Sequence, residues 1–138
     1  MDKEKLNEIL EKHKKWLNKE YGGERADMSN SDLRHSDLRG SDLRGSDLSN
    51  SDLSYSNIDY SGWPLWCGSL NVHIDDRIAR QLLYHLMRPC LVSPNVSEDF
   101  KRALFTPELI AEANKFHRVD ECGLIENPYE EENHGQSN

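Results

Sequence analysis

Five-residue repeats run without interruption from Ala26 to Tyr60, and they constrain the fold of this 138-residue chain more than any other feature. In register, the seven units read ADMSN, SDLRH, SDLRG, SDLRG, SDLSN, SDLSY and SNIDY. A strict period of five fits neither the 3.6-residue period of an amphipathic helix nor the two-residue period of a strand. A short fixed period instead indicates units that stack on one another along an axis.

Two places in each unit are predicted to face the inside of such a stack. The third place is always apolar, and the first place is always small, being Ala26 in the first unit and serine afterwards. A buried hydroxyl without a partner costs about 1–3 kcal/mol, so the inward serines are expected to bond backbone carbonyls at the corners. The predicted core of the repeats consists of Met28, Leu33, Leu38, Leu43, Leu48, Leu53 and Ile58.

This order of small residue, Asp or Asn, Leu, polar residue and any residue closely resembles the pentapeptide-repeat family. The resemblance covers residues 26–60, with Ser61-Gly62-Trp63 as a degenerate eighth unit. It implies a mainly β fold, a right-handed quadrilateral β-helix with four repeats per coil and about two coils. In that stacking, Met28 lies over Leu48, Leu33 over Leu53 and Leu38 over Ile58.

Two coils cannot shield their own open ends, so the flanking segments are expected to cap the rod. Residues 1–25 are predicted to form an N-terminal capping helix, because residues 3–20 carry one apolar stripe and Tyr21-Gly22-Gly23 follows. His13 and Trp16 lie on this stripe and are assigned to packing. The β-helix is assigned to residues 26–65, a C-terminal helical region to 66–125 and a flexible acidic tail to 126–138.

The C-terminal helical region shows helix signals at three places. A short strand near Leu70–Ile74 is followed by a helix from about Asp75 to Met87, which Arg88-Pro89 is expected to stop. Further helices are predicted to start at Ser97-Glu98-Asp99 and at Thr106-Pro107-Glu108.

Composition indicates a protein without a membrane span. The chain has no run of eighteen apolar residues and no signal peptide, so a cytoplasmic location is expected. Cys67, Cys90 and Cys122 are too few and too irregular for a disulfide framework and are predicted to be reduced thiols. The net charge of −8 argues against direct binding of nucleic acid, which needs clustered Lys and Arg.

Catalytic chemistry finds little support in the sequence. No Gly-rich phosphate loop, HExxH or GxSxG motif occurs. The spacing Cys67…His73…His85…Cys90 lacks the close CxxC pair of structural zinc sites, so small buried thiols are favoured. We therefore predict no catalytic residues, no metal and no cofactor, and an enzyme with an unrecognised Cys/His site is the weakest alternative.

The outward face of the repeats is predicted to bind a partner. Seven acids and three bases lie between residues 26 and 60, and Arg34, Arg39 and Arg44 partly neutralise the first coil. The residues assigned to partner binding are Asp32, Asp37, Asp42, Asp47, Asp52, Asp59, Tyr55 and Tyr60. The alternative for each Asp is a purely structural role, in which its carboxylate bonds the backbone of its own turn.

Two protein-binding functions are considered. The first is a non-enzymatic inhibitor that presents an acidic, DNA-mimic-like surface to a host protein with a basic nucleic-acid-binding groove. The run WPLWCGS and the following IARQLLYHLMR resemble the C-terminal part of small pentapeptide-repeat proteins of phages and prophages. That resemblance implies a phage-encoded protein in a bacterial host, acting like an anti-CRISPR on a CRISPR effector or another defence nuclease.

The second function is a general protein-interaction module that uses the Trp63–Trp66 segment and the C-terminal helices. Members of the pentapeptide-repeat family that resemble DNA bind DNA gyrase, which gives a third kind of target. Two coils extend only ~10 Å, however, against ~34 Å for one turn of B-DNA. Gyrase mimicry would therefore need a homodimer that joins two rods.

Overall fold

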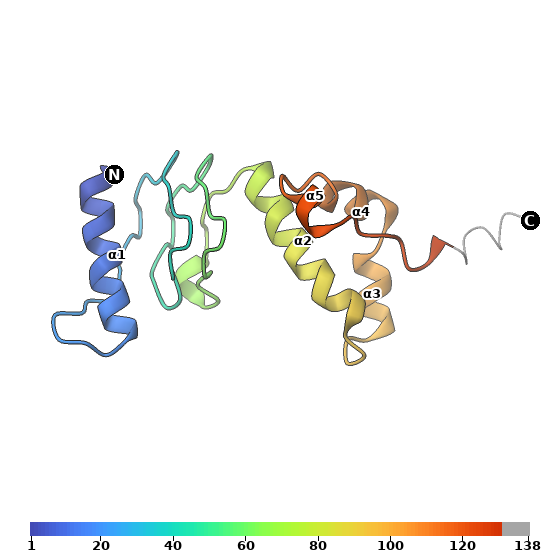
Figure 1. Ribbon diagram of the computed structural model, residues 1–138, viewed down its shortest axis with the longest axis horizontal. Helices are drawn as coiled ribbons and strands as arrows, with labels where there is room; N and C mark the ends of the chain where they lie inside the picture. Colours follow the sequence, from blue (N-terminus) through green and yellow to red (C-terminus); the bar gives the residue numbers. More distant parts are fainter. Residues whose placement is uncertain (131–138) are drawn as a thin grey trace, which may run out of the picture. The chain divides into compact units, whose positions relative to one another are not determined.

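The computed structural model describes residues 1–130, which divide into two compact units. The first unit, Met1–Asp75, contains helix α1 (Lys3–Leu17), the repeats and the short 3-10 helix η1 (Cys67–Ser69). The second unit begins at Asp76 and contains α2 (Asp76–Val92), α3 (Glu98–Leu104), α4 (Pro107–Ala113) and α5 (Val119–Cys122) (Figure 1). Each unit has a buried core of its own.

The repeats wind into a coil that advances by four units, or twenty residues, per turn. Parallel backbone bridges join Asp27 to Asp47, Asp32 to Asp52, Asp37 to Asn57 and Asp42 to Gly62. At the first bridge, Met28 N–H donates to the Asp47 carbonyl at 2.7 Å, and Asp47 N–H donates to the Ala26 carbonyl at 2.9 Å. We call residues 26–75 the repeat coil, with a first turn over 26–45 and a second over 46–65.

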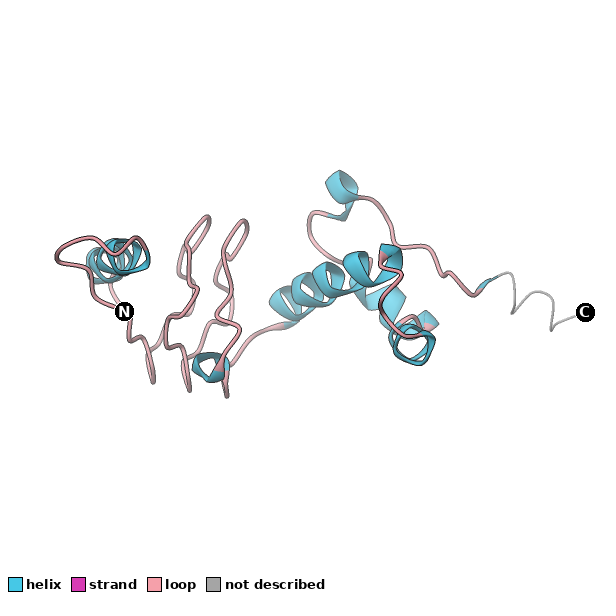
Figure 2. Cartoon of the chain, turned by 90° about the horizontal axis from the view of Figure 1, so that it is seen from below, coloured by secondary structure: helices cyan, strands magenta, loops and turns pink. Residues whose placement is uncertain are grey.

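The prediction of a mainly β fold, a right-handed quadrilateral β-helix, is wrong. Helices make up 42% of the structure, strands and bridges only 7%, and no sheet is found within residues 1–130. Figure 2 shows the repeat coil as loop except at η1. Each side of the coil is too short for a strand, because one residue per unit forms a bridge and a hydrogen-bonded turn follows at once.

The apolar third place of each unit lies inside the repeat coil. The side chains of Met28 and of the five leucines are 0% exposed, and Ile58 is 6% exposed. In the second turn, the hydroxyls of Ser46, Ser51 and Ser56 are also buried and donate to the carbonyls of Leu43, Leu48 and Leu53. The three inward serines of the second turn thus bond corner carbonyls, as the cost of a buried unpaired hydroxyl requires, whereas Ser31, Ser36 and Ser41 of the first turn are only half-buried.

Helix α1 crosses the N-terminal mouth of the repeat coil. It begins at Lys3, where the Asp2 carboxylate accepts a hydrogen bond from Lys5 N–H at 2.8 Å. It ends at Leu17, before the predicted glycine stop, and Lys19 there adopts a positive φ of 57°. The fully buried His13 accepts a bond from Ala26 N–H at Nδ1, so Nε2 carries the proton and donates to the Arg44 carbonyl.

Residues 66–75 form a partial third turn on the other end of the second turn. Leu48 N–H donates to the Gly68 carbonyl at 2.7 Å, and Asn50 N–H donates to the Leu70 carbonyl at 3.2 Å. The strand expected near Leu70–Ile74 is reduced to a single bridge between Asp52 and His73. This segment covers part of the edge that the second turn would otherwise expose.

The second unit is a small helical domain. Its core consists of Tyr84, Met87, Cys90, Leu104, Phe105, Ile110, Ala113, Phe116 and Ile125. Helix α2 continues through Pro89 to Val92 and does not stop at Arg88-Pro89 as predicted. The proline removes one helical hydrogen bond, but the following turn buries Cys90 and packs Leu91 on the core, which offsets the loss.

Tyr129, in the segment that follows Glu126, packs against helix α3. The Tyr129 hydroxyl donates to Glu98 at 3.0 Å, and the guanidinium of Arg102 lies 4.3 Å from the centre of the Tyr129 ring. The rest of the acidic tail predicted over 126–138 lies, from residue 131 on, outside the described residues. Among the helices within residues 1–130, none is both long and apolar enough to cross a bilayer.

Candidate functional site

The aspartates at the second place of the repeats close local turns. The carboxylates of Asp27, Asp32, Asp37, Asp42, Asp47 and Asp52 each accept a hydrogen bond from the backbone N–H two residues later, at 2.9–3.2 Å. Asn57 does the same through its side-chain oxygen, with Asp59 N–H as donor. The structural role considered for each Asp is therefore present at every unit, and any partner binding is additional to it.

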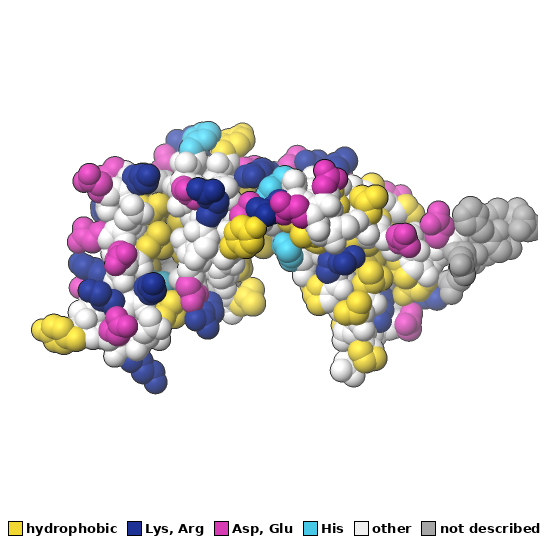
Figure 3. Space-filling model, in the orientation of Figure 1, with side chains coloured by type: hydrophobic (Ala, Val, Ile, Leu, Met, Phe, Trp, Pro, Cys, Tyr) yellow, Lys and Arg dark blue, Asp and Glu magenta, His cyan; other side chains and the backbone are white. Residues whose placement is uncertain are grey.

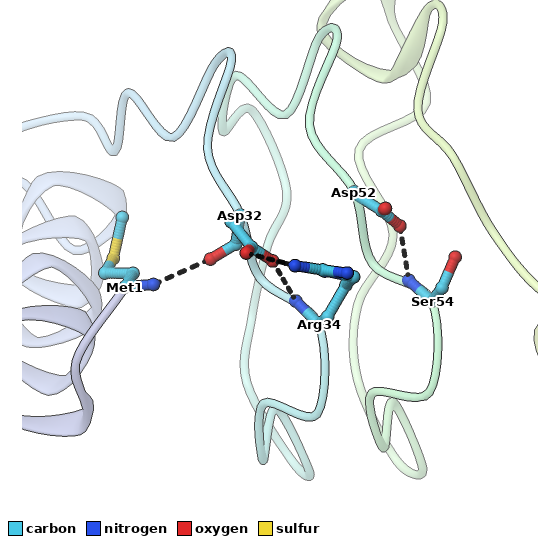
Figure 4. Close-up of polar contacts among 5 residues, drawn as sticks. All are labelled: Met1, Asp32, Arg34, Asp52 and Ser54. Atoms are coloured by element: carbon cyan, nitrogen blue, oxygen red, sulfur yellow. Dashed lines mark hydrogen bonds and ion pairs between the residues drawn. The ribbon is translucent and has the colours of Figure 1, made fainter.

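In the first turn, three carboxylates are also paired with arginine. Arg34 binds Asp32 through two nitrogens, with the shorter contact at 2.8 Å, and Arg39 and Arg44 bind Asp37 and Asp42 in the same way. Figure 4 shows the Asp32 pair, together with the Met1 ammonium that donates to the Asp32 carbonyl at 2.8 Å. Hydrogen bonds from Arg34 lower the pKa of Asp32 well below its usual range. These three carboxylates are largely neutralised by their own repeats.

Asp27 of the first turn, which bonds Ser29, and the carboxylates of the second turn lack such an arginine. Asp47 accepts bonds from the Ser49 backbone N–H and hydroxyl, and Asp52 from Ser54 N–H. The Ser54 hydrogen bonds lower the pKa of Asp52, with a smaller contribution from the charge of Arg34. Asp59 is only 6% exposed, so its predicted role on the contact surface is not supported. The outward acidic charge of this turn is therefore carried by Asp47 and Asp52.

The charge on the first unit is mixed in sign. Figure 3 shows Lys and Arg side chains interspersed with Asp and Glu over the visible face of the repeat coil and α1. The three Arg–Asp pairs of the first turn account for part of this alternation. No continuous acidic patch covers this face of the first unit.

The fifth place of every unit turns the chain and adopts a left-handed backbone conformation. Its φ is positive in all seven units, at Asn30, His35, Gly40, Gly45, Asn50, Tyr55 and Tyr60. Gly and Asn adopt this conformation readily, whereas Tyr does so at a cost of about 1–2 kcal/mol. The recurrence of Gly and Asn at this place is a signal that the sequence analysis missed.

The two tyrosines at these corners are exposed to solvent. Tyr55 is 66% exposed and Tyr60 is 77% exposed. The Tyr55 ring stacks on His35 of the first turn, with ring centres 5.2 Å apart and planes at 12°. The backbone N–H of Tyr55 donates to the Asp75 carboxylate. We call the side between these corners the tyrosine side, which comprises residues 35–40 and 55–60. It presents two large aromatic rings to solvent where smaller residues would fold more easily.

The Trp63–Trp66 segment is partly occupied by contacts within the first unit. The Trp66 indole N–H donates to the Ser46 carbonyl at 2.8 Å, and the Arg25 guanidinium lies 4.1 Å from the centre of its ring. Trp63 is half-buried, while Leu65 between the two tryptophans is 90% exposed. Trp66 thus fixes the start of the partial third turn, which gives it a structural role.

The candidate Cys/His set is divided between the units. Cys67 and His73 belong to the first unit, where His73 bonds the coil through its backbone and Cys67 is exposed, so the prediction of a buried thiol is wrong for Cys67. Cys90 is buried in the core of the second unit, where the His85 ring lies edge-on to Phe116. Within residues 1–130, no three His, Cys, Asp or Glu side chains are grouped so that they could hold a metal ion.

Comparison with known families agrees with the repeat pattern. Residues 25–59 match the family model described as "Pentapeptide repeats (8 copies)". The matched segment is the part of the chain that forms the first turn and most of the second. No curated protein and no solved structure matches the chain.

Proposed function

Since residues 25–59 of this chain are pentapeptide repeats, we propose that it is a non-enzymatic protein-binding module that makes contact through the tyrosine side of the repeat coil. The observation that carries the proposal is the pair of exposed tyrosines, Tyr55 and Tyr60, at left-handed corners. Tyrosine is enriched in protein interfaces, because its ring buries a large area and its hydroxyl can bond a partner. Tyrosine at a corner where Gly or Asn would fold more easily favours a role in binding.

The proposed partner is a protein with a basic, nucleic-acid-binding groove, which the chain inhibits by occupying it. Support comes from Asp47 and Asp52 on the second turn, which have no arginine two residues later. Such charges would mainly accelerate association and select the partner, while the tyrosines would supply most of the affinity. A phage-encoded inhibitor of a defence nuclease or CRISPR effector is the finer form of this proposal, and it rests on the sequence resemblance.

The aromatic part is tested by capture from bacterial lysate with variants that preserve the fold. Tyr55→Asn and Tyr60→Asn place at these corners the residue that the chain itself uses at Asn30 and Asn50. We expect the double variant to lose a partner that the wild type retains, as read by quantitative mass spectrometry. Asn50→Gly, at the same place in another unit, is the matched control and should retain it. Capture of the same proteins by all three chains would refute a contact at the tyrosine side.

The electrostatic part is tested separately. Asp47→Asn and Asp52→Asn remove charge but keep the oxygen that accepts the Ser49 and Ser54 N–H bonds. We expect the double variant to associate more slowly with the captured partner and to lose most of the salt dependence of the association rate. Surface plasmon resonance at two salt concentrations measures both. An unchanged salt dependence would leave the binding module intact and remove the basic groove from the proposal.

A further inference from the structure

Helix α1 covers the mouth of the repeat coil only in part. At one end of the helix, the Met1 ammonium reaches the Asp32 carbonyl, and near the other end His13 bonds Ala26 and the Arg44 carbonyl. The stretch of the first turn from residue 36 to 42 lies to one side of this path. A cavity of about 700 Å³ opens there between α1 and the coil. A second hollow, of about 420 Å³, shares Leu10 with it and continues along the helix past Lys14.

The backbone edge in this opening has free hydrogen-bonding groups. Asn57 N–H donates to the Ser36 carbonyl, and Leu38 N–H donates to the Asn57 carbonyl, so these two groups of the first turn face the second. The N–H and C=O of Asp37, which lies between them, must then point the other way, toward the mouth. Within the part of the chain that the structure describes, no hydrogen bond joins these two groups to another residue. They form the free edge of a parallel bridge.

The walls of the cavity combine apolar and cationic groups. Leu6 and Leu10 of α1 and the ring of Tyr60 line it. Four positively charged groups also line it, the Met1 ammonium, Lys3, Arg34 and Arg39, against the single carboxylate of Asp37. Arg34 and Arg39 are engaged by Asp32 and Asp37, and the Met1 ammonium by the Asp32 carbonyl. Lys3 forms no ion pair with any residue of the described range 1–130 and is the cation available to a ligand, although its charge also acts on Asp37. This local excess of positive charge contrasts with the net charge of −8 for the whole chain.

We propose that this cavity, the mouth groove, binds an extended segment of a partner protein that alternates apolar and acidic residues. The segment adds to the free edge at Asp37 through backbone hydrogen bonds, as extended peptides add to exposed sheet edges. Its apolar side chains pack against Leu10 and Tyr60, and an acidic side chain meets Lys3. The mouth groove adjoins the tyrosine side, because His35, Arg39 and Tyr60 line it, but it lies apart from the acidic residues Asp47 and Asp52.

The probe is the synthetic heptapeptide VEVEVEV, titrated into the full-length, isotope-labelled chain and followed by NMR. We expect the Asp37 amide to shift and to exchange its proton more slowly with solvent when the peptide is bound. The Asp27 amide is the internal control, because it faces the mouth on the other side of α1, where the opening is only about 270 Å³. Binding that leaves the Asp37 amide unchanged, or no binding at all, would overturn the proposal.

A pair of single variants tests the role of charge. Lys3→Glu reverses the cation in the mouth groove, while Lys5→Glu makes the same change at a residue that lines the smaller opening. We expect Lys3→Glu to weaken the peptide about fivefold and Lys5→Glu to leave it unchanged, a size typical of one exposed charge pair. The peptide VKVKVKV should bind the wild type more weakly than VEVEVEV. Equal effects of the two variants would show that the groove does not select an acidic segment.

Discussion

His13 shows how one side chain can close the end of a coil. Its ring projects from α1 toward the coil, is fully buried, and connects two backbone groups that lie at opposite ends of the first turn. Nδ1 accepts from Ala26 N–H at 3.0 Å, and Nε2 donates to the Arg44 carbonyl at 2.8 Å. An imidazole can accept at one nitrogen and donate at the other, which an apolar residue of the same size cannot do.

His13→Ala is therefore expected to destabilise the first unit by about 2–4 kcal/mol, because two buried backbone groups lose their partners and a cavity forms. Urea denaturation followed by tryptophan fluorescence measures this, since Trp16, Trp63 and Trp66 all lie in the first unit. Lys14→Ala, an exposed change in the same helix, is the control. A free energy of unfolding within 0.5 kcal/mol of the wild type, roughly the spread of ordinary surface substitutions, would contradict this role.

The glycines at the corners differ in how much space a side chain would have there. Gly40 and Gly45 occupy the fifth place of successive units, with φ of 67° and 73°. A Cβ at Gly40 would meet nothing within 4 Å, whereas a Cβ at Gly45 would lie 3.1 Å from the Trp16 ring. The absence of a side chain at Gly45 lets α1 approach the coil, while at Gly40 it serves only the backbone turn.

At the scale of the element, this gives a matched pair of variants. Gly40→Asn is expected to leave the stability of the first unit unchanged within about 0.5 kcal/mol, because Asn tolerates the left-handed turn. Gly45→Asn has the same backbone but must displace Trp16, so we expect a loss of about 1–2 kcal/mol, comparable to overpacking. Thermal unfolding followed by tryptophan fluorescence compares the two. Equal melting temperatures would show that α1 shifts on the coil without cost.

The period of five was sufficient to predict which side chains point into the coil, because the place of a residue within the five-residue unit decides whether it faces inward, like Leu, or outward, like Asp. It was not sufficient to predict the secondary structure around it. Each side of the coil holds one bridge, as at Asp37 and Asn57, and the helices that precede and follow the repeats in the sequence contain more residues than these bridges do. The extension of α2 beyond Pro89 depends on tertiary burial of Cys90, which no local pattern contains.

The candidate site was predicted less well than the core, for a similar reason. Spacing predicts that an acidic residue faces outward but does not show whether an arginine neutralises it, as at Asp32, or whether it is buried, as at Asp59 in the fourth place of its unit. Exposure of Tyr55 and Tyr60 follows from their corner position, which Gly40 and Asn50 mark in other units. Repeats should therefore be compared place by place, including the place that looks unconstrained.

At the scale of the whole molecule, acid should act mainly on the first unit. Hydrogen bonds from arginine or serine lower the pKa of Asp27, Asp32, Asp37, Asp42 and Asp52 in the folded chain. A carboxyl whose pKa is lower when folded adds stability above its unfolded pKa of about 4 and loses it as pH falls further. In the second unit, the pKa of Glu112 is lowered in the same way by Arg80.

We expect the melting temperature of the first unit, read by tryptophan fluorescence, to stay nearly constant from pH 7 to 5 and to fall below about pH 4. The decrease should be moderate, because the carboxylates are exposed and their interactions are screened by solvent. Asp32→Asn together with Asp37→Asn should reduce the decrease. A melting temperature that is unchanged down to pH 2.5 would show that these hydrogen bonds do not stabilise the folded coil.

The division into two units predicts two unfolding transitions. The core of the first unit is formed by the repeats and α1, and that of the second by Tyr84, Phe105, Phe116 and their neighbours, so each can be lost while the other persists. Tryptophan fluorescence reports only the first unit, whereas far-UV circular dichroism reports the helices of both. We expect the two signals to give different urea midpoints, and His13→Ala to lower only the fluorescence midpoint. Coincident midpoints that shift together in His13→Ala would show that the units unfold as one, and that binding at the coil is linked to the stability of the helical unit.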